Sequence, residues 1–398
     1  MSWRRSSAWV LQDNGTWRAG QGVKIVVDEN IPCVREAFGT LGDVVVLPGR
    51  EIGPEQVRDA DFLIVRSVTP VNERLLKGSR VRFVGSVTIG LDHVDEAYLR
   101  ARGIALAYAP GSNANSVAEY VVAALVALGR EQYAGRTLGI IGLGRIGTLV
   151  QGKALALGMT VVANDPPLER AGQTGLVSLE ALLKQSDIVT CHVPLAQAGP
   201  DATHHLLDAA RLSLLRRHAI VINTARGAVI DNAALLHALR GERLGGAILD
   251  VWEDEPEPDP ALIQAVTLGT PHIAGYSWDG KVAGVKMLYD AACDYLQRAS
   301  AWIPPAPEDD AMRGAVTIDA NRSLDEILCE LVRRAYDICH DDAALRAIAG
   351  LSSHERGRAF DQLRATYRTR LEFGRTRVVV PSGGGTLRDT LRRVGFTV

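Results

Sequence analysis

The sequence predicts an α/β protein with two doubly wound parallel-sheet domains in tandem and a small α+β domain at the C-terminal end. Three observations indicate this class. Short β-branched runs alternate with helical patterns over residues 23–110, and the same alternation restarts at residue 137. A stretch rich in proline and acid then interrupts the pattern at residues 303–310. The alternation predicts βαβ units, and the interruption predicts a domain boundary.

The first series contains five predicted strands, separated by segments of helical composition such as CVREAFGTLG and NERLLKG. The strands are VKIVV (23–27), VVVLPG (44–49), FLIVRS (62–67), VRFVGSV (81–87) and IALAYAP (104–110). We expect this domain to cover residues 23–117, with a returning helical segment in residues 276–303. Residues 1–22 precede the pattern. A family resemblance, whose motifs are given below, begins at Val23 and implies that residues 1–22 are a non-native or disordered extension, with Val23 as the biological start.

The second series begins after SVAEYVVAALVALGR (116–130), whose apolar length predicts a buried helix joining two domains. Its predicted strands are TLGIIG (137–142), TVVAND (160–165), DIVTCHV (187–193), AIVINTA (219–225) and GGAILDVW (245–252). This series predicts a second doubly wound domain over residues 118–275. VAGVKMLYDAACDYLQ (282–297) is a further helical stretch that carries the chain back to the first domain.

The C-terminal segment, residues 304–398, has a different pattern. SLDEILCELVRRAYDI carries apolar residues at helical spacing, a stripe that must pack against something. Eleven arginines and no lysine follow residue 340. Acids are interleaved throughout, so we favour an amphipathic helix with solvated or interfacial arginines over a nucleic-acid patch. We expect a small dimerisation domain.

Composition excludes several classes. Apolar residues make up 47% and charged residues 23%, as in soluble domains. The 44 basic and 46 acidic residues leave a net charge of −2, so no nucleic-acid or membrane partner is expected. No run of about 18 apolar residues and no secretory h-region occurs. The five cysteines form no CxxC pair and no metal-ligand spacing, which predicts reduced thiols in the cytoplasm and no metal.

A glycine-rich motif, GIIGLGRIG, follows the first strand of the second series and opens a helix. Gly142, Gly144 and Gly147 permit a tight turn, close approach of a pyrophosphate and close helix packing. The next strand ends at Asp165, whose carboxylate can bind the adenosine ribose hydroxyls. Asp165 would repel the additional phosphate of NADP, and prolines follow it. The sequence therefore predicts NAD, and no second module for a flavin is visible.

Three later loops supply groups for oxidising a 2-hydroxy acid. Arg226 lies in INTARGAVID, Glu255 in LDVWEDEP and His272 in TPHIAGY, and the first two follow strands. An arginine can bind a carboxylate in a bidentate way, a histidine can take the hydroxyl proton, and a glutamate can stabilise the protonated histidine. Each alone has a structural explanation, but together they predict a catalytic site. His204 and His205 lack acidic partners at recognisable spacing, so structural or rim roles are expected.

These motifs resemble those of the D-2-hydroxyacid dehydrogenases. The resemblance assigns Arg226, Glu255 and His272 to catalysis. Asp250 matches a residue that approaches the nicotinamide end of NAD. The residues expected to contact NAD are Gly142, Gly144, Arg145, Ile146, Gly147, Asp165, Val193, Thr224, Ala225, Asp250 and Gly275. Val193 departs from the family, which commonly has threonine there.

One branch of this family has a C-terminal dimerisation domain. This chain resembles that branch in the segments VVDENIP, VRSVTPVNERLL, HIAGYSWDGK and YDICHDDAALRAIAG. The resemblance implies a homodimer and a small phosphorylated 2-hydroxy acid as substrate. We expect 4-phosphoerythronate, oxidised in vitamin B6 biosynthesis. Ser67, Thr88 and Tyr276 are expected to touch the substrate, and Arg66 to bind its phosphate.

Two alternatives stay open. An enzyme of the same class could act on 3-phosphoglycerate or another D-2-hydroxy acid. An NAD-responsive corepressor-like binding protein could also use this fold and keep all three catalytic residues.

Overall fold

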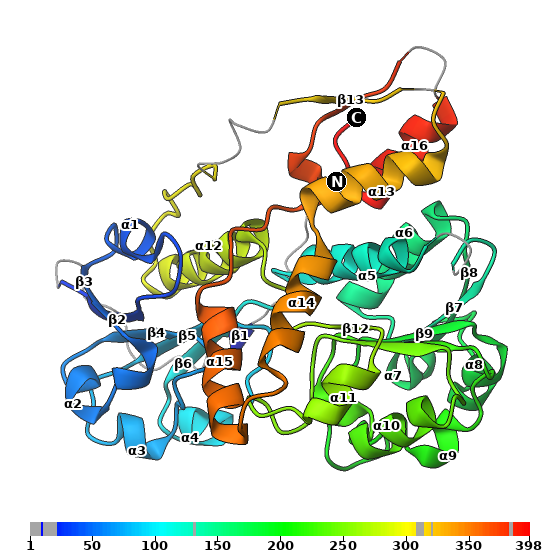
Figure 1. Cartoon of the computed structure of the whole chain (residues 1–398). Coiled ribbons are helices and arrows are strands. Elements are labelled where there is room, and N and C mark those ends of the chain that lie inside the picture. Colours follow the sequence, from blue (N-terminus) through cyan, green and yellow to red (C-terminus); the bar gives the residue numbers. More distant parts are fainter. Residues whose placement is uncertain (1–8, 11–21, 130–132, 308–313, 320, 382–384) are drawn as a thin grey trace. The chain divides into compact units, whose positions relative to one another are not determined.

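The computed structural model describes residues 9–10, 22–129, 133–307, 314–319, 321–381 and 385–398 (Figure 1). The chain divides into two compact units. The first comprises Met1–Asn113 and Trp278–Pro307, and the second comprises Ala114–Ser277 and Glu308–Val398. Each unit contains its own six-stranded sheet. The predicted α/β class is confirmed.

In the first unit the strand order is β1-β6-β5-β4-β2-β3, and β2 to β6 run parallel. The strands are β1 (Trp9–Val10), β2 (Lys24–Asp28), β3 (Asp43–Leu47), β4 (Phe62–Val65), β5 (Phe83–Ser86) and β6 (Ala105–Tyr108). The helices are α1 (Val34–Phe38), 3-10 helix η1 (Gly49–Glu51), α2 (Pro54–Val57), α3 (Glu73–Leu76), α4 (Glu96–Ala101) and α12 (Trp278–Tyr295).

Alternating side chains of these strands fill two separate cores. Ile25 and Phe62 pack with α12 on one face, and Val26 and Leu63 pack on the other face. This division follows from the two-residue period of a strand, which sends successive side chains to opposite faces. Both faces are apolar because both are covered by helices, as parallel sheets require.

The second unit has the strand order β12-β11-β10-β9-β7-β8, and every pair is parallel. The strands are β7 (Thr137–Ile141), β8 (Thr160–Asn164), β9 (Ile188–Cys191), β10 (Ile220–Asn223), β11 (Gly246–Leu249) and β12 (Leu268–Gly269). The helices are α5 (Ala114–Leu128), α6 (Arg145–Ala156), α7 (Pro166–Arg170), α8 (Leu179–Gln185), α9 (Ala209–Leu212), 3-10 helix η3 (Gly227–Val229), α10 (Asn232–Arg240) and α11 (Pro260–Ala265). The carboxyl ends of the parallel strands meet at one edge, which is where ligands bind in such sheets.

The C-terminal segment is mainly helical and packs within the second unit (Figure 1). Its elements are β13 (Val316–Thr317), α13 (Leu324–Ala335), α14 (Ile338–Ile348), α15 (Ser353–Ala365), 3-10 helix η5 (Phe373–Arg375), β14 (Val378–Val379) and α16 (Gly385–Val394). The predicted apolar stripe lies on α13, where Leu331 and Val332 join one core with the residues of α5. The stripe is therefore covered by the same chain.

Some predictions remain untested. Most of the predicted extension over residues 1–22 lies outside the described residues, although Trp9 and Val10 pair with β6 in antiparallel fashion. The division into three domains also stays a prediction. Among the described helices, none has the length and apolar character needed to cross a lipid bilayer.

Candidate active site

The glycine loop after β7 is packed tightly on its inner side. Gly142 has a φ of 90°, and a Cβ there would lie 2.7 Å from the carbonyl oxygen of His192. A Cβ on Gly147 would lie 2.1 Å from the carbonyl oxygen of Gly142. At Gly144, by contrast, an added Cβ would meet no atom within 4 Å. The loop thus requires glycine at two positions for its own fold and leaves open space at the third.

Asp165 connects this loop to the end of β8. Its Oδ2 accepts a hydrogen bond from the N–H of Leu143 at 2.9 Å, and its Oδ1 accepts one from the N–H of Leu168 at 3.0 Å. The second bond caps α7. Each carboxylate oxygen can accept more than one hydrogen bond, so ribose hydroxyls could bind here as well. The glycines, the open space and the carboxylate fit a dinucleotide such as NAD.

Arg226 stands in a turn that Asn223 fixes at the end of β10. The Asn223 side chain donates from Nδ2 to the carbonyl oxygen of Arg226 at 2.9 Å and accepts from the N–H of Ala225 at 3.0 Å. The guanidinium of Arg226 donates to the carbonyl oxygen of Ala225 at 2.8 Å. Thr224 lies 3.3 Å from Nδ1 of His192 through its hydroxyl. The predicted residues 224–226 therefore form one hydrogen-bonded turn.

Glu255 and His272 form a hydrogen-bonded pair with 2.7 Å between Oε2 and Nδ1. The other carboxylate oxygen of Glu255 accepts the N–H of Trp252 at 2.9 Å. Burial alone would raise the pKa of Glu255, but the charge and hydrogen bond of His272, the N–H of Trp252 and the charge of Arg364 together lower it. An ionised Glu255 places the hydrogen of His272 on Nδ1, which leaves Nε2 as the basic atom.

Asp250 stabilises the loop that carries His272 by accepting hydrogen bonds from it. Its carboxylate is buried and accepts hydrogen bonds from the hydroxyl of Thr270 at 2.6 Å and from the N–H groups of Ile273 and Ala274 at 2.7 and 2.9 Å. His272 itself has a φ of 56°, a conformation that few residues adopt without support. Burial raises the pKa of Asp250, although His272 and these donors oppose the rise. Its predicted approach to nicotinamide stays a prediction.

Arg226, Glu255 and His272 line one cavity of about 370 Å³. The three side chains come from three separate loops of the second unit. The remaining lining residues are Leu195, His204, Gly227, Ala228, Trp252, Glu253 and Asp254. The structure therefore brings together the cation, the base and the carboxylate that the sequence singled out.

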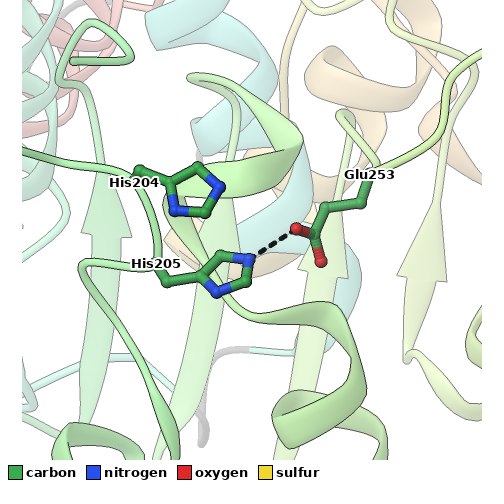
Figure 2. Close-up of side chains that lie close together, drawn as sticks. All are labelled: His204, His205 and Glu253. Atoms are coloured by element: carbon green, nitrogen blue, oxygen red, sulfur yellow. Dashed lines mark hydrogen bonds and ion pairs between the residues drawn. The ribbon is translucent and has the colours of Figure 1, made fainter. Parts of the chain in front are cut away.

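His204 and Glu253 line this cavity, and His205 lies beside them. Figure 2 shows the three side chains close together. His205 Nε2 lies 2.6 Å from Oε1 of Glu253, and the rings of His204 and His205 stack with centroids 4.1 Å apart. The sequence shows no acid at a recognisable spacing from either histidine, because Glu253, the partner of His205, lies 48 residues further along the chain. The donor atoms of the three residues lie within 4.8 Å of one another and could bind a divalent ion. The hydrogen bond between His205 and Glu253 explains the arrangement of these side chains without an ion.

Three predicted substrate residues lie in the first unit. Arg66 and Ser67 follow β4, where Arg66 donates from Nε to the buried Asp28 at 3.0 Å. Thr88 follows β5, and its hydroxyl donates to the carbonyl oxygen of Gly90 at 2.8 Å and contacts the hydroxyl of Ser86 at 2.7 Å. Ser67 is exposed. All three stand at the carboxyl edge of their own sheet, and their contact with substrate stays a prediction.

Tyr276, the fourth predicted substrate residue, has a neighbour that the sequence did not reveal. Arg364 of α15 donates from Nη2 to the Tyr276 hydroxyl at 3.2 Å, and its guanidinium carbon lies 5.7 Å from the centre of the Tyr276 ring. Arg364 was one of eleven arginines in the tail. No local motif distinguishes it, because only the fold brings residue 364 to residue 276.

Cys191 and His192 offer no nucleophile. Burial raises the pKa of the Cys191 thiol to about 12 and lowers the pKa of His192 to about 3. Both groups are therefore neutral at ordinary pH. Cys191 belongs to the core, as expected for a residue within a central strand.

Comparisons with known proteins agree with this geometry. Residues 112–274 match the family model "D-isomer specific 2-hydroxyacid dehydrogenase, NAD binding domain". Residues 310–395 match a domain of unknown function, DUF3410.

Two curated relatives extend the similarity over most of the chain. An erythronate-4-phosphate dehydrogenase of Salinibacter ruber is 52% identical and aligns with 88% of this chain and 92% of its own. That of Cellvibrio japonicus is 45% identical over 94% of this chain and 99% of its own. Among solved structures, a D-lactate dehydrogenase from Aquifex aeolicus, complexed with NAD and lactic acid, is 26% identical. It covers 69% of this chain and 95% of its own with a TM-score of 0.59.

Proposed function

The chain belongs to the erythronate-4-phosphate dehydrogenases of the D-2-hydroxyacid dehydrogenase family, and we propose from this that 4-phospho-D-erythronate is its substrate. It is an NAD-dependent dehydrogenase that oxidises this hydroxy acid to 2-oxo-3-hydroxy-4-phosphobutanoate, a step of vitamin B6 biosynthesis. The observation that carries the proposal is that Arg226, Glu255 and His272 line one cavity, with Glu255 and His272 already hydrogen-bonded.

NAD would be held by the glycine loop and its neighbours. The N-terminus of α6 and the open space at Gly144 suit a pyrophosphate, and Asp165 suits the adenosine ribose. Val193, Thr224, Ala225, Asp250 and Gly275 are the further residues proposed to line the nicotinamide half. When bound, NAD supplies the acceptor for the hydride that leaves C2 of the substrate.

Each of the three catalytic residues has a separate role in the reaction. Arg226 binds the substrate carboxylate, because its planar guanidinium can donate two parallel hydrogen bonds. His272 removes the C2 hydroxyl proton through Nε2, since Nδ1 is committed to Glu255. The positive charge that forms on the imidazole is stabilised by the ionised Glu255. Ser67, Thr88, Tyr276 and, for the phosphate, Arg66 are proposed to hold the rest of the substrate.

The test is NADH formation by the purified protein with NAD and either 4-phosphoerythronate or 3-phosphoglycerate. We expect selective turnover of phosphoerythronate. Preference for phosphoglycerate would keep the chemistry and overturn the substrate assignment. If neither compound is oxidised while NADH still binds, the enzyme proposal fails and an NAD-responsive binding protein becomes the better description.

Homodimerisation and a cytoplasmic location complete the proposal. The resemblance of YDICHDDAALRAIAG to C-terminal dimerisation domains supports a dimer, whereas the apolar stripe of α13 does not, because it is covered within the chain. Five free cysteines, two of them buried, support a reducing compartment. Light scattering of the purified protein measures the mass, and a monomer at micromolar concentration would contradict the dimer.

A further inference from the structure

Glu253 connects three loops at the carboxyl edge of the sheet in the second unit. It stands two residues before Glu255, in the loop that follows β11. Its Oε1 lies 2.6 Å from Nε2 of His205, in the loop that follows β9 (Figure 2). Its Oε2 accepts the N–H of Asn232 at 2.8 Å, in the segment that follows β10 and carries Arg226. One carboxylate therefore joins the loops after three neighbouring strands, β9, β10 and β11.

The contact between Glu253 and Asn232 is reciprocal. The backbone N–H of Glu253 donates to Oδ1 of Asn232 at 3.2 Å, in return for the bond that its side chain accepts. The two loops also meet backbone to backbone, because a Cβ on Gly227 would lie 2.4 Å from the nitrogen of Glu253. Gly227 directly follows Arg226, so the loop that carries Arg226 is held against the loop that carries Glu255.

His205 is itself bonded to the loop that carries Arg226. Its backbone N–H donates to the carbonyl oxygen of Ala228 at 2.7 Å, and its ring stacks on that of His204. The φ of His205 is 47°, a conformation that few residues adopt without support. His205 thus holds the carboxylate of Glu253 from a position that the fold fixes. Glu253, His205 and Asn232 are called the Glu253 network below.

The Glu253 network lies beside the catalytic groups. Glu253 lines the same cavity as Arg226, Glu255 and His272. Its two carboxylate oxygens are both within hydrogen-bond distance of protein groups. A carboxylate would repel an anionic substrate, so Glu253 is better suited to supporting its neighbours than to binding that substrate. The groups that it supports are the two loops on which the catalytic residues stand.

We propose that Glu253 is a positioning residue, which sets the separation between Arg226 and the Glu255–His272 pair. This inference rests on the proposed function. In a 2-hydroxy acid the carboxylate and the reacting hydroxyl are on adjacent carbon atoms, so Arg226 and His272 must reach neighbouring atoms of one substrate at the same time. A displacement of about 1 Å between such groups can lower the rate by about 10²-fold. The Glu253 network prevents that displacement by joining the two loops directly.

The first experiment compares Glu253→Ala and Glu253→Gln with a matched control, Glu180→Ala, which removes an exposed glutamate from α8. We expect Glu253→Ala to lower kcat/KM for the hydroxy acid by about 10- to 100-fold. Glu253→Gln should stay close to wild type, because an amide can accept the N–H of Asn232 and donate to a neutral His205. Glu180→Ala should behave as wild type. An equal loss in the alanine and glutamine variants would overturn the proposal.

A double-mutant cycle separates positioning from a merely structural role. Arg226→Lys already holds the substrate carboxylate poorly, so a displaced Arg226 loop matters less in that background. If Glu253 acts by placing Arg226, Glu253→Ala lowers kcat/KM by a smaller factor in Arg226→Lys than in wild type. Fully multiplicative losses would overturn the proposal. Unfolding midpoints show that each variant is folded, and His205→Ala, which removes only one bond of the network, replaces Glu253→Ala if that protein does not fold.

Hydrogen–deuterium exchange followed by mass spectrometry tests the network without turnover. Peptides that cover residues 226–234 should exchange faster in Glu253→Ala than in wild type, because the N–H of Asn232 loses its acceptor. Glu253→Gln should retain the protection. Unchanged exchange in Glu253→Ala would overturn the proposal. If wild type oxidises no 2-hydroxy acid, the proposed function fails, and the exchange rates still decide whether Glu253 holds the Arg226 loop.

Discussion

At the scale of single residues, the proposed mechanism depends on His272 as the base. We predict that His272→Ala lowers kcat by about 10²- to 10⁴-fold, because it removes the imidazole that Glu255 supports as the proposed base. The matched control is His218→Ala, which removes an exposed histidine. The measurement is steady-state NADH formation with 4-phosphoerythronate. Turnover within threefold of wild type in the His272 variant would mean that a different group is the base.

Arg226 permits a test of geometry at constant charge. Arg226→Lys keeps the cation but loses the planar pair of donors that binds a carboxylate in two places. We expect kcat/KM to fall by about 10²-fold, with much of the loss in KM, because the substrate carboxylate is less well held. Kinetics of the purified variant, with its unfolding midpoint as the folding control, measure both. A KM equal to that of wild type would show that Arg226 does not bind the carboxylate.

At the scale of elements, two glycines of the loop have different roles: the fold requires Gly147, whereas the open space at Gly144 is proposed to receive the cofactor. Gly147→Ala places a methyl 2.1 Å from the carbonyl oxygen of Gly142, whereas Gly144→Ala meets no protein atom within 4 Å. We predict that Gly147→Ala lowers the free energy of unfolding by about 1–3 kcal/mol and that Gly144→Ala leaves it nearly unchanged. Both variants should bind NADH more weakly, as measured by fluorescence titration. Wild-type NADH affinity in Gly144→Ala would argue against a pyrophosphate at this loop.

The C-terminal segment is anchored to α5 and α6 by buried polar groups. Glu119 on α5 accepts the N–H of Phe373 at 2.9 Å, and Lys153 on α6 donates to the carbonyl oxygen of Val394 at 2.6 Å. Burial raises the pKa of Glu119 to about 8, and Glu372 adds to the rise, although Lys153 opposes it. The anchor is therefore expected to respond to pH.

This response has a defined sign. The folded pKa of Glu119 lies above its ordinary value of 4.5, so the folded chain holds a proton that the unfolded chain releases. The contribution of Glu119 to stability is complete below pH 4.5 and is lost as the pH rises to about 8. Each pKa unit corresponds to about 1.4 kcal/mol, so the total loss is a few kcal/mol at most. We predict that Glu119→Gln lacks this loss.

Denaturant unfolding of wild type and Glu119→Gln at several pH values measures the effect. The difference in unfolding free energy between the two proteins should change in favour of the variant as the pH rises from 4.5 to 8. Titrating groups that do not interact with Glu119 contribute equally to both proteins and cancel in this difference, whereas Lys153 and Glu372 contribute to the measured effect because their charges interact with Glu119. A difference that is independent of pH would show that Glu119 is ionised throughout.

At the scale of the whole molecule, the sequence predicted most of the features that depend on residues close together in the chain. Five strands of each sheet, β2 to β6 and β7 to β11, and the loops bearing Arg226, Glu255 and His272 follow from short apolar runs and the residues just after them, whereas the two-residue strands β1 and β12 were not predicted. The partners of His205, Arg364 and the α13 stripe could not be predicted in this way. Each depends on residues far along the chain that only the fold brings close, and amphipathicity does not say which surface covers a helix.

The covered stripe leads to a final prediction about assembly. Leu331 on α13 is fully buried in the core shared with α5. Leu331→Ala should therefore lower the free energy of unfolding by about 2–5 kcal/mol, the usual result of a cavity in a core. It should leave the mass of the folded protein unchanged in light scattering, because Leu331 does not face a partner. If Leu331 instead lay at a dimer interface, the variant would dissociate to a monomer with little change in its own unfolding at low protein concentration. The two measurements together therefore distinguish a core residue from an interface residue, and they direct the search for the dimer surface away from this face of α13.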